Sequence, residues 1–436
     1  MNFNYEKQIQ RIVNYIKSGE TNPEEFAVGV EFEHFVVDKN SFNTISYYGA
    51  NGVSTTLNEL LNYFKSNNPI YDNDNLLGFE CEDFAVTTEP GAQFEVSINA
   101  KKNLNELFEK YKNFINAILP FFHKKNQTLV LMGYHPITKI DDIKILPKKR
   151  YDYMYEYFNR AGTMAHNMMK GTCAVQVVID YKNEDDFVKK YFVGNVISPI
   201  LYTIFDNSPI FEGDTYNDFN LRQKIWENTD KDRSGLFDIA FEKDLNYKKY
   251  AEKILNTPMI FTDRNHKLEE AYDKKIKDVF DPENDDDGFI YHALSIVFPD
   301  LRVKRYLEFR MMDAVKYPYN FSASALIKGL FYDEDNLNKL YEKYKDITYD
   351  KIFEIGTKSR KDGLNTKFLN STIRDEALSL IELAYKGLCE DEKKFLDPIY
   401  ELIKNNKTLH EKFIEICNRE NFKSAIEQLE EVKNVQ

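Results

Sequence analysis

Polar and apolar residues alternate at four places along the chain, and each alternation predicts a β-strand with one polar face. In the first, Glu31 and Glu33 alternate with Val30 and Phe32. Because successive side chains of a strand point to opposite faces, both glutamates face one side and the apolar residues face the core. The other stretches are 87–97, 172–180 and 305–310. Their polar faces carry Glu89, Gln93 and Glu95, then Thr172, Gln176 and Asp180, then Glu308 and Arg310.

Helical periodicity surrounds these strands. Apolar residues recur at three- and four-residue spacing in 5–18, 55–64, 104–122, 151–158 and 187–205. From Tyr319 to the end the pattern is helical and charged, without a strand. The combination predicts an α+β fold. In it, residues 1–318 form a sheet-and-helix region that holds the catalytic residues, and residues 319–436 form a helical region packed on it within one structural domain.

A single strand of this kind is most simply an antiparallel strand with its polar face in water. Four of them in one chain favour a bent, mainly antiparallel sheet whose polar faces line a trough. The carboxylates that would then converge are Glu31, Glu33, Glu89, Glu95 and Glu308. Pro90 and Gly91 interrupt the second stretch and indicate a bend or a sheet edge there.

Carboxylates on neighbouring strands repel one another unless a cation lies between them. An all-oxygen ligand set favours Mg²⁺ or Mn²⁺, whereas zinc prefers histidine and cysteine. The coordination shell of Mg²⁺ is commonly completed by oxygens of substrate phosphates. Arg233 and Arg310 supply guanidinium groups that bind phosphate or carboxylate bidentately. The set therefore indicates phosphoryl transfer from ATP. The simpler interpretation of residues 226–235, which include Arg233, is a solvated charged loop.

Composition narrows the class of protein. A formal charge of −13 and a pI near 5.2 argue against a nucleic-acid-binding protein, although a local arginine cluster still permits an anionic substrate. No apolar run reaches membrane-spanning length and the N-terminus lacks the form of a signal peptide, so we expect a cytoplasmic protein without membrane contact. The four cysteines form no CxxC motif, and Cys173 falls on the apolar face of its strand. We therefore expect reduced thiols and no thiol switch.

Motifs of other catalytic classes are absent from the sequence. The chain contains no GxxxxGK[ST], GxGxxG, HExxH or GxSxG. A carboxylate pair could serve glycoside hydrolysis, but that reaction does not require this many carboxylates together with arginines.

Several of these stretches resemble the plant-type glutamate–cysteine ligases, a family with many bacterial members. The matching segments are 29–33, 89–95, 168–177, 229–235 and 302–310, in the family's order and spacing, within a similarity from about residue 26 to about residue 415. The resemblance implies a glutamine-synthetase-like fold, in which a bent sheet forms a funnel with helices outside. It also implies that ATP phosphorylates the γ-carboxylate of L-glutamate and that the amine of L-cysteine then displaces phosphate, giving γ-glutamylcysteine.

The resemblance also assigns roles to residues of this sequence. Arg310 and Arg233 are expected to be catalytic. Expected contacts to substrates or ATP come from Gln176, Arg150, Lys304, Arg233 and Arg310, and the expected metal ligands are Glu31, Glu33, Glu89, Glu95 and Glu308. The implied partners are the small molecules ATP, glutamate and cysteine, with Mg²⁺ or Mn²⁺ as cofactor and no nucleic acid.

Two departures from the family pattern concern the substrates. Family members often have arginine where this chain has Gly171, so a guanidinium that could hold a substrate carboxylate is missing unless Lys170 reaches in. Many members also have Glu-His-Glu-Lys where this chain has Glu31-Phe32-Glu33-His34. The alternatives are therefore a related ligase that uses a different amine, and a non-catalytic nucleotide-binding relative. The large set of carboxylates argues against the second.

Overall fold

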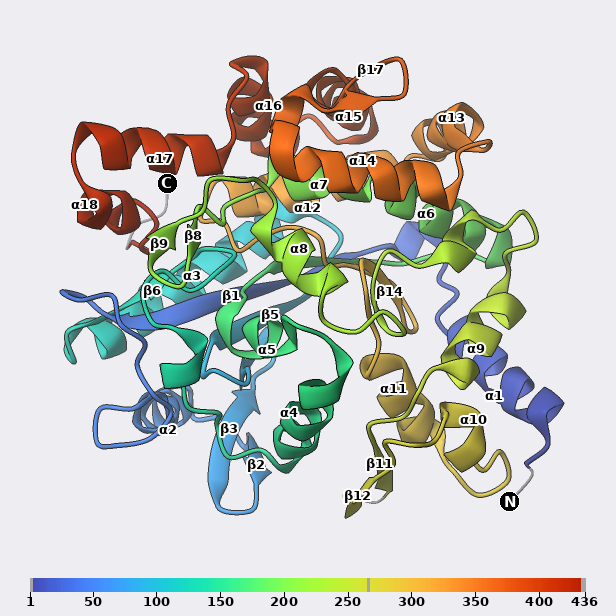
Figure 1. Cartoon of the computed structure of the whole chain (residues 1–436), viewed down its shortest axis with the longest axis horizontal. Helices are drawn as coiled ribbons and strands as arrows, with labels where there is room; N and C mark the ends of the chain where they lie inside the picture. Colours follow the sequence, from blue (N-terminus) through green and yellow to red (C-terminus); the bar gives the residue numbers. More distant parts are fainter. Residues whose placement is uncertain (1–2, 265–266, 433–436) are drawn as a thin grey trace.

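The computed structural model describes residues 3–264 and 267–432, and within them a curved nine-stranded sheet runs through the molecule (Figure 1). Eight of its strands follow one another in the order β14-β15-β7-β1-β5-β4-β3-β2, and β6 pairs with the far end of β1. Every pairing in this sheet is antiparallel. Its strands are β1 (Val28–Asp38), β2 (Asn68–Asp72), β3 (Asn75–Glu80), β4 (Phe84–Thr88), β5 (Phe94–Lys101), β6 (Gln127–Val130), β7 (Val175–Ile179), β14 (Leu301–Val303) and β15 (Leu307–Phe309).

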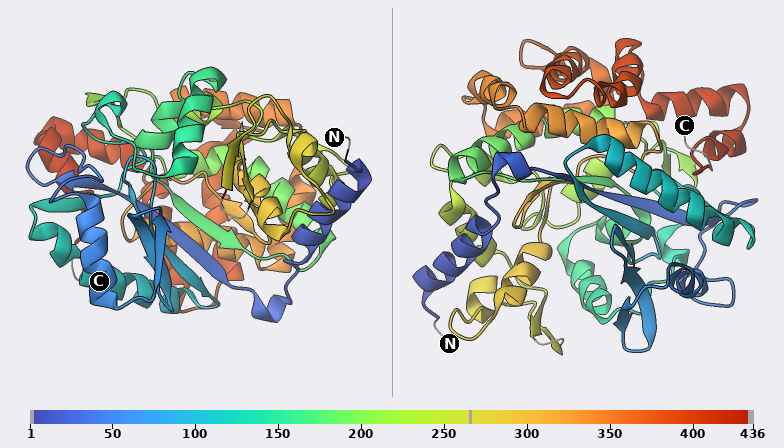
Figure 2. Two further views of the ribbon diagram at one scale, coloured as in Figure 1. Left: turned by 90° about the horizontal axis from the view of Figure 1, so that it is seen from below. Right: turned by 180° about the vertical axis from the view of Figure 1, so that it is seen from behind.

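Helices lie on both sides of the sheet, and α3, which packs on β5 and β6, lies in front of the sheet when the molecule is seen from behind (Figure 2). The helices before residue 300 are α1 (Tyr5–Lys17), α2 (Val53–Phe64), α3 (Leu104–His123), α4 (Lys149–Ala161), α5 (Ala165–Gly171), α6 (Glu184–Val196), α7 (Ser198–Ile204), α8 (Leu221–Glu227), α9 (Tyr247–Asn256), α10 (Ile276–Val279) and α11 (Asp287–Ser295). The later helices are α12 (Tyr319–Phe331), α13 (Glu334–Tyr344), α14 (Tyr349–Asp362), α15 (Ile373–Gly387), α16 (Asp397–Lys404), α17 (Leu409–Arg419) and α18 (Phe422–Glu427).

Short two-stranded ladders complete the structure. They pair β8 (Ile210–Phe211) with β9 (Asp214–Thr215), β10 (Ser234–Gly235) with β13 (Phe298–Pro299), β11 (Phe261–Arg264) with β12 (Lys267–Glu270), and β16 (Lys367–Phe368) with β17 (Ser371–Thr372). The α+β class with a mainly antiparallel sheet is thus confirmed.

The second predicted strand is wrong as a continuous element. Residues 87–97 form the end of β4, a turn and the start of β5, and the two strands pair antiparallel with Thr87 opposite Glu95. Ala92 adopts a positive φ of 66° within this turn, and its backbone N–H donates to the carbonyl oxygen of Glu89. Because the chain reverses at Pro90 and Gly91, Glu89 lies in the turn and not on the strand that carries Glu95.

Two other expectations about elements need correction. The stretch 187–205 is two buried helices, α6 and α7, which meet at Ile197. The chain beyond Tyr319 is helical as expected but also contains the hairpin of β16 and β17.

The C-terminal helical region shares the hydrophobic core of the sheet. The ring of Phe321 on α12 lies 5.8 Å from that of Phe32 on β1 and 5.7 Å from that of Tyr111 on α3. The boundary expected at residue 318 stays a prediction. In the part of the chain that the structure describes, no helix combines the length and the apolar character needed to cross a membrane.

Candidate active site

Three glutamates come together on one face of the sheet. Glu31 and Glu33 lie on β1 and Glu95 lies on β5, and one carboxylate oxygen from each falls within 4.8 Å of the others. The strand register explains the cluster, because Glu33 is directly opposite Glu95 and Glu31 is opposite Gln176 of β7. The alternation within β1 therefore becomes a three-carboxylate group only through pairing with β5.

Mutual repulsion and burial disfavour the charged forms of these carboxylates and raise their pKa values. Burial, followed by the charges of Glu31 and Glu89, raises the pKa of Glu33 to about 8. Burial, followed by the charge of Glu308, raises the pKa of Glu31. Burial, followed by the charges of Glu31, Glu89 and Glu33, raises the pKa of Glu95 well above its usual range. A divalent cation would favour the charged forms of all three. The oxygen donors fit Mg²⁺ or Mn²⁺.

Gln176 orients two of the three carboxylates. Its amide nitrogen donates to Glu31 and, at 2.9 Å, to Glu33, while its amide oxygen accepts from Arg310. The backbone N–H of Ala174 donates to the second oxygen of Glu33 at 2.7 Å. Thr87 donates to Glu95. These hydrogen bonds fix the carboxylates before any ligand binds.

A group of cations lies beside the glutamates, around Glu308. Arg302 donates to the two carboxylate oxygens of Glu308 at 2.5 and 2.8 Å, and Arg310 lies 3.5 Å from one of them. Burial alone would raise the pKa of Glu308, but Arg302, Lys304 and Arg310 hold it below its ordinary value. The structure therefore gives Glu308 guanidinium partners, and its expected part as a metal ligand stays a prediction.

Lys304 and Arg150 lie apart from each other, and neither lines the cavity beside the glutamates. Lys304 is buried in the turn between β14 and β15, with its ammonium 4.8 Å from the centre of the Tyr291 ring and close enough to Glu308 and Glu31 to feel their charge. Arg150 begins α4, and its guanidinium lies 5.8 Å from the Phe261 ring. Both binding roles stay predictions.

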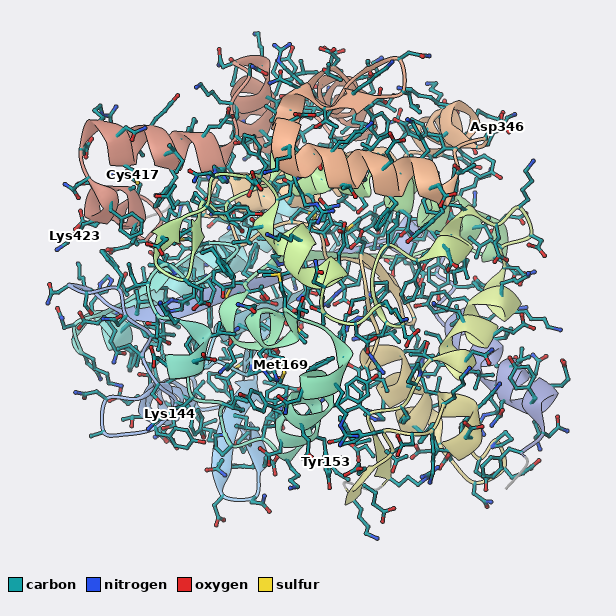
Figure 3. All side chains as sticks on the ribbon, in the orientation of Figure 1. Lys144, Tyr153, Met169, Asp346, Cys417 and Lys423 are labelled. Carbon is teal, nitrogen blue, oxygen red and sulfur yellow. The ribbon has the colours of Figure 1, made fainter. Side chains whose placement is uncertain are left out.

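A small cavity of about 80 Å³ opens next to the glutamates. Its charged and polar wall includes Glu33, Glu89, Arg222 and Arg310, and its apolar wall includes Met154, Met168, Met169, Trp226 and Phe298. Figure 3 shows Met169 on α5, near the middle of the molecule. Glu89, which lies in the turn before β5, accepts a long hydrogen bond of 3.4 Å from Tyr151. The wall of the cavity thus combines carboxylates, guanidinium groups and an apolar surface.

Arg222 is a cavity residue that the sequence analysis missed. It lies on α8, and its Nη1 atom donates to the carbonyl oxygens of Arg310 and Met311 at 2.8 and 3.2 Å. Its Nε atom is buried without a hydrogen-bond partner among the described residues. Trp226, one helical turn later, lies against the same guanidinium at 5.7 Å. The i, i+4 spacing of arginine and tryptophan was the available signal.

Arg233 is not brought to the carboxylate cluster or to this cavity. Its guanidinium donates to Asp230 at 2.6 Å, to the carbonyl oxygens of Pro258 and Ile296, and to the hydroxyl of Tyr157. The side chain is fully buried, so the interpretation of its segment as a solvated loop is wrong for Arg233, whereas Lys231 and Asp232 are exposed. These bonds tie α4 to the segment after α8. The expected catalytic role of Arg233 stays a prediction.

The ring of Tyr134 occupies the space beside Gly171. A Cβ atom on Gly171 would come within 2.7 Å of the Tyr134 ring, whose hydroxyl donates to Glu212 at 2.6 Å. Lys170 turns to another partner, the carbonyl oxygen of Ile143 at 3.2 Å. The structure therefore provides no lysine in place of the family's arginine, and the positive charge in the wall of the cavity comes from Arg222 and Arg310.

Comparison with known proteins places the chain among enzymes of one kind. The model of the glutamate-cysteine ligase family 2 (GCS2) matches residues 27–427. The chain is 27% identical over 422 residues to the chloroplastic glutamate–cysteine ligase of Arabidopsis thaliana, covering 94% of this chain and 80% of that protein. It is 28% identical over 392 residues to the chloroplastic glutamate–cysteine ligase A of Oryza sativa subsp. indica, covering 86% and 77%.

A solved structure shares the fold. The crystal structure of a glutamate–cysteine ligase from Francisella tularensis in complex with AMP aligns with a TM-score of 0.54 and 12% identity, over 93% of this chain and 87% of that one. The predicted glutamine-synthetase-like architecture is therefore confirmed.

Proposed function

Because the chain belongs to the glutamate–cysteine ligase family 2, we propose that it joins the γ-carboxylate of L-glutamate to the amine of L-cysteine in an ATP-dependent reaction. One observation carries the proposal beyond family membership. Three glutamates, of which Glu31 is only partly buried, each offer a carboxylate oxygen within 4.8 Å of the others, beside a cavity lined by two arginines. This arrangement suits a divalent cation together with anionic substrates.

The chemistry takes place in two steps. An oxygen of the γ-carboxylate attacks the γ-phosphorus of ATP, and ADP leaves, which converts a poor acyl electrophile into an acyl phosphate. The cysteine nitrogen then attacks the acyl carbon, phosphate leaves, and the amine releases a proton. A bound Mg²⁺ or Mn²⁺ would neutralise phosphate charge during the transfer. No covalent enzyme nucleophile is required.

The residues of the cavity supply positioning. Glu31, Glu33 and Glu95 would hold the metal ion, and Gln176 keeps two of these carboxylates in place. Arg222 would bind the α-carboxylate of glutamate, since its guanidinium is fixed by backbone carbonyls and it lines the cavity.

The phosphates of ATP would be bound beside the cluster, where Arg310 lines the cavity. Arg310, just after β15, and Lys304, in the turn before it, would face them next to the pair of Arg302 and Glu308. Catalysis on this arrangement rests on charge neutralisation and orientation.

A ligase that uses a different amine is the second candidate. The observation that favours it is Gly171, where family members often have arginine. The Tyr134 ring occupies the space beside this glycine. The apolar wall, with three methionines, a tryptophan and a phenylalanine, suits a small uncharged or thiol side chain on the amine substrate. It would not suit a charged one.

Purified protein incubated with ATP, Mg²⁺, glutamate and a panel of amino acids tests both candidates. We expect phosphate release that depends on both glutamate and cysteine, with a product of the mass of γ-glutamylcysteine. Release with another amine and not with cysteine would support the second candidate. Phosphate release without any ligated product, or none at all, would refute ligation. We further propose a cytoplasmic location, although the plant relatives are chloroplastic.

A further inference from the structure

The chain continues past the residues that match the family, and its next residues lie along the main sheet. The family match ends at residue 427, at the end of α18. Beyond it, the backbone N–H of Leu131 donates to the carbonyl oxygen of Leu429 at 3.1 Å, and the N–H of Glu431 donates to that of Leu129 at 2.9 Å. Residues 428–431, the tail segment, thus lie against β6, which pairs with β1. Figure 1 shows α17 and α18 beside β6.

The tail segment places a carboxylate in the interior. Glu431 has only 2% of its surface exposed. The hydroxyl of Tyr111 donates to its Oε1 atom, and the Nε2 atom of His34 lies 3.7 Å from the same oxygen. Lys316 contributes an opposite charge nearby, since the Glu431 carboxylate counteracts the lowering of the Lys316 pKa by burial. An unpaired buried carboxylate would be strongly unfavourable, so these partners account for its placement.

Both partners of Glu431 lie directly behind the three-carboxylate cluster. His34 follows Glu33 on β1, and its Nδ1 atom donates to the carbonyl oxygen of Phe94 on β5 at 3.1 Å. That bond links the strands one residue pair away from Glu33 and Glu95, which are opposite each other. Because a carbonyl only accepts, Nδ1 carries the hydrogen and Nε2 is the nitrogen that faces Glu431.

Tyr111 supports the same face of the strand, on the other side of Glu33 along the chain. Its ring lies 4.5 Å from that of Phe32, the residue between Glu31 and Glu33. Burial and the charge of Glu431 raise the pKa of Tyr111 well above its usual range, so its hydroxyl remains a donor. Glu431 therefore accepts a hydrogen bond from Tyr111 and lies 3.7 Å from the Nε2 atom of His34, which has no hydrogen-bond partner among the described residues. Tyr111 contacts β1 just before Glu33, and His34 belongs to β1 just after it.

We propose that Glu431 is a positioning residue for the metal-binding carboxylates, acting through His34 and Tyr111 on the pairing of β1 with β5. The inference rests on the proposed function, because it assumes that Glu31, Glu33 and Glu95 hold the cation. A residue that only anchors the tail segment would change stability without changing the affinity of the cluster for metal.

The test measures Mn²⁺ binding to the substrate-free enzyme by electron paramagnetic resonance, together with thermal unfolding and Mg²⁺-dependent turnover. The variant is Glu431→Gln, which keeps the shape and removes the charge. The matched control is Glu430→Gln, one residue earlier in the tail segment, whose carboxylate accepts from Thr128 at 3.1 Å and does not contact His34 or Tyr111. We expect Glu431→Gln to raise the Mn²⁺ dissociation constant by about tenfold, at the lower end of the range for groups behind a ligand. Glu430→Gln should leave it unchanged within about twofold, since its charge lies outside the chain of contacts to the cluster.

Two further variants keep the outcome decisive. Glu33→Gln tests the site itself, and if it binds Mn²⁺ like wild type, the metal site of the proposed function fails and the inference fails with it. If Glu33→Gln loses Mn²⁺ while Glu431→Gln binds it normally, only the inference is overturned. Should Glu431→Gln not fold, Tyr111→Phe removes one partner with little change in volume. Weaker Mn²⁺ binding by that variant supports the inference, and wild-type binding overturns it.

Discussion

Replacing Arg222 by lysine is expected to weaken the binding of glutamate far more than the binding of ATP. The guanidinium reaches the cavity while its Nη1 atom stays bonded to the carbonyl oxygens of Arg310 and Met311. The remaining N–H groups can then face a substrate carboxylate. A lysine has one compact ammonium, which can bond to those carbonyls or face the cavity but cannot reproduce the planar fork that does both.

The size of the effect follows from the bonds that are lost. One hydrogen bond between a guanidinium and a carboxylate contributes about 1.5–3 kcal/mol. At about 1.4 kcal/mol for each factor of ten, its loss raises the KM for glutamate by about 10- to 150-fold. The KM for ATP should change by less than about threefold, because in our proposal Arg310 and Lys304 face the phosphates instead.

The assay combines steady-state kinetics with a binding measurement that does not depend on turnover. Trp226 is the single tryptophan of the chain and lies against Arg222, so its fluorescence should report glutamate binding. Arg360→Lys is the matched control. Arg360 lies on α14 and forms an ion pair of 2.9 Å with Glu227, the last residue of the helix that carries Arg222, but it does not line the cavity. An Arg222→Lys enzyme with the wild-type KM for glutamate, or with equal increases for glutamate and ATP, would refute the assignment.

Four other outcomes are expected. Glu33→Gln should abolish nearly all activity without lowering the thermal unfolding midpoint, because it removes a charge that burial and Glu31 disfavour; a melting curve and a turnover assay check this. Gly171→Ala should destabilise the protein by about 1–3 kcal/mol in urea unfolding, since its methyl group meets the Tyr134 ring, and Tyr134→Ala should relieve the effect. Burial lowers the pKa of His292 from 6.5 to about 4, so the free energy of unfolding of the wild type should fall by up to about 3 kcal/mol as the pH falls through this interval. The urea midpoint of His292→Gln should not show this decrease. Without reductant, denatured protein should show all four thiols in a titration, and dithiothreitol should leave activity unchanged.

The strand periodicity predicted the faces of the sheet but not the neighbours across it. Glu31 and Glu33 share a face because a strand repeats every two residues, which is a local property. Their meeting with Glu95 depends on the register between β1 and β5, which a single alternating pattern does not specify. The same limit explains Glu89. The alternation continues through the turn at Pro90 and Gly91, so a reversal of the chain resembles a longer strand.

The two arginines of the segment 221–235 show why charge patterns are ambiguous. Arg233 stands in a run of charged residues, yet it is fully buried because Asp230 and three oxygen acceptors satisfy its guanidinium. Arg222 stands in a short helix of mixed composition and lines the cavity. Burial of an arginine depends on acceptors that other segments provide, such as the carbonyls of Arg310 and Met311, and these are distant in sequence.

The position of the opposite charges also reconciles an acidic protein with an anionic substrate. The chain carries a formal charge of −13, which would repel ATP at long range. At the site, however, the glutamates lie on one side and Arg302, Lys304 and Arg310 surround Glu308 on the other. Binding a divalent cation to the glutamates would turn their side of the cavity from a barrier to phosphate into a partner for it. The affinity for ATP should therefore depend steeply on metal concentration, and much less so in a Glu33→Gln enzyme, because its cluster has lost one of the three carboxylates that hold the ion.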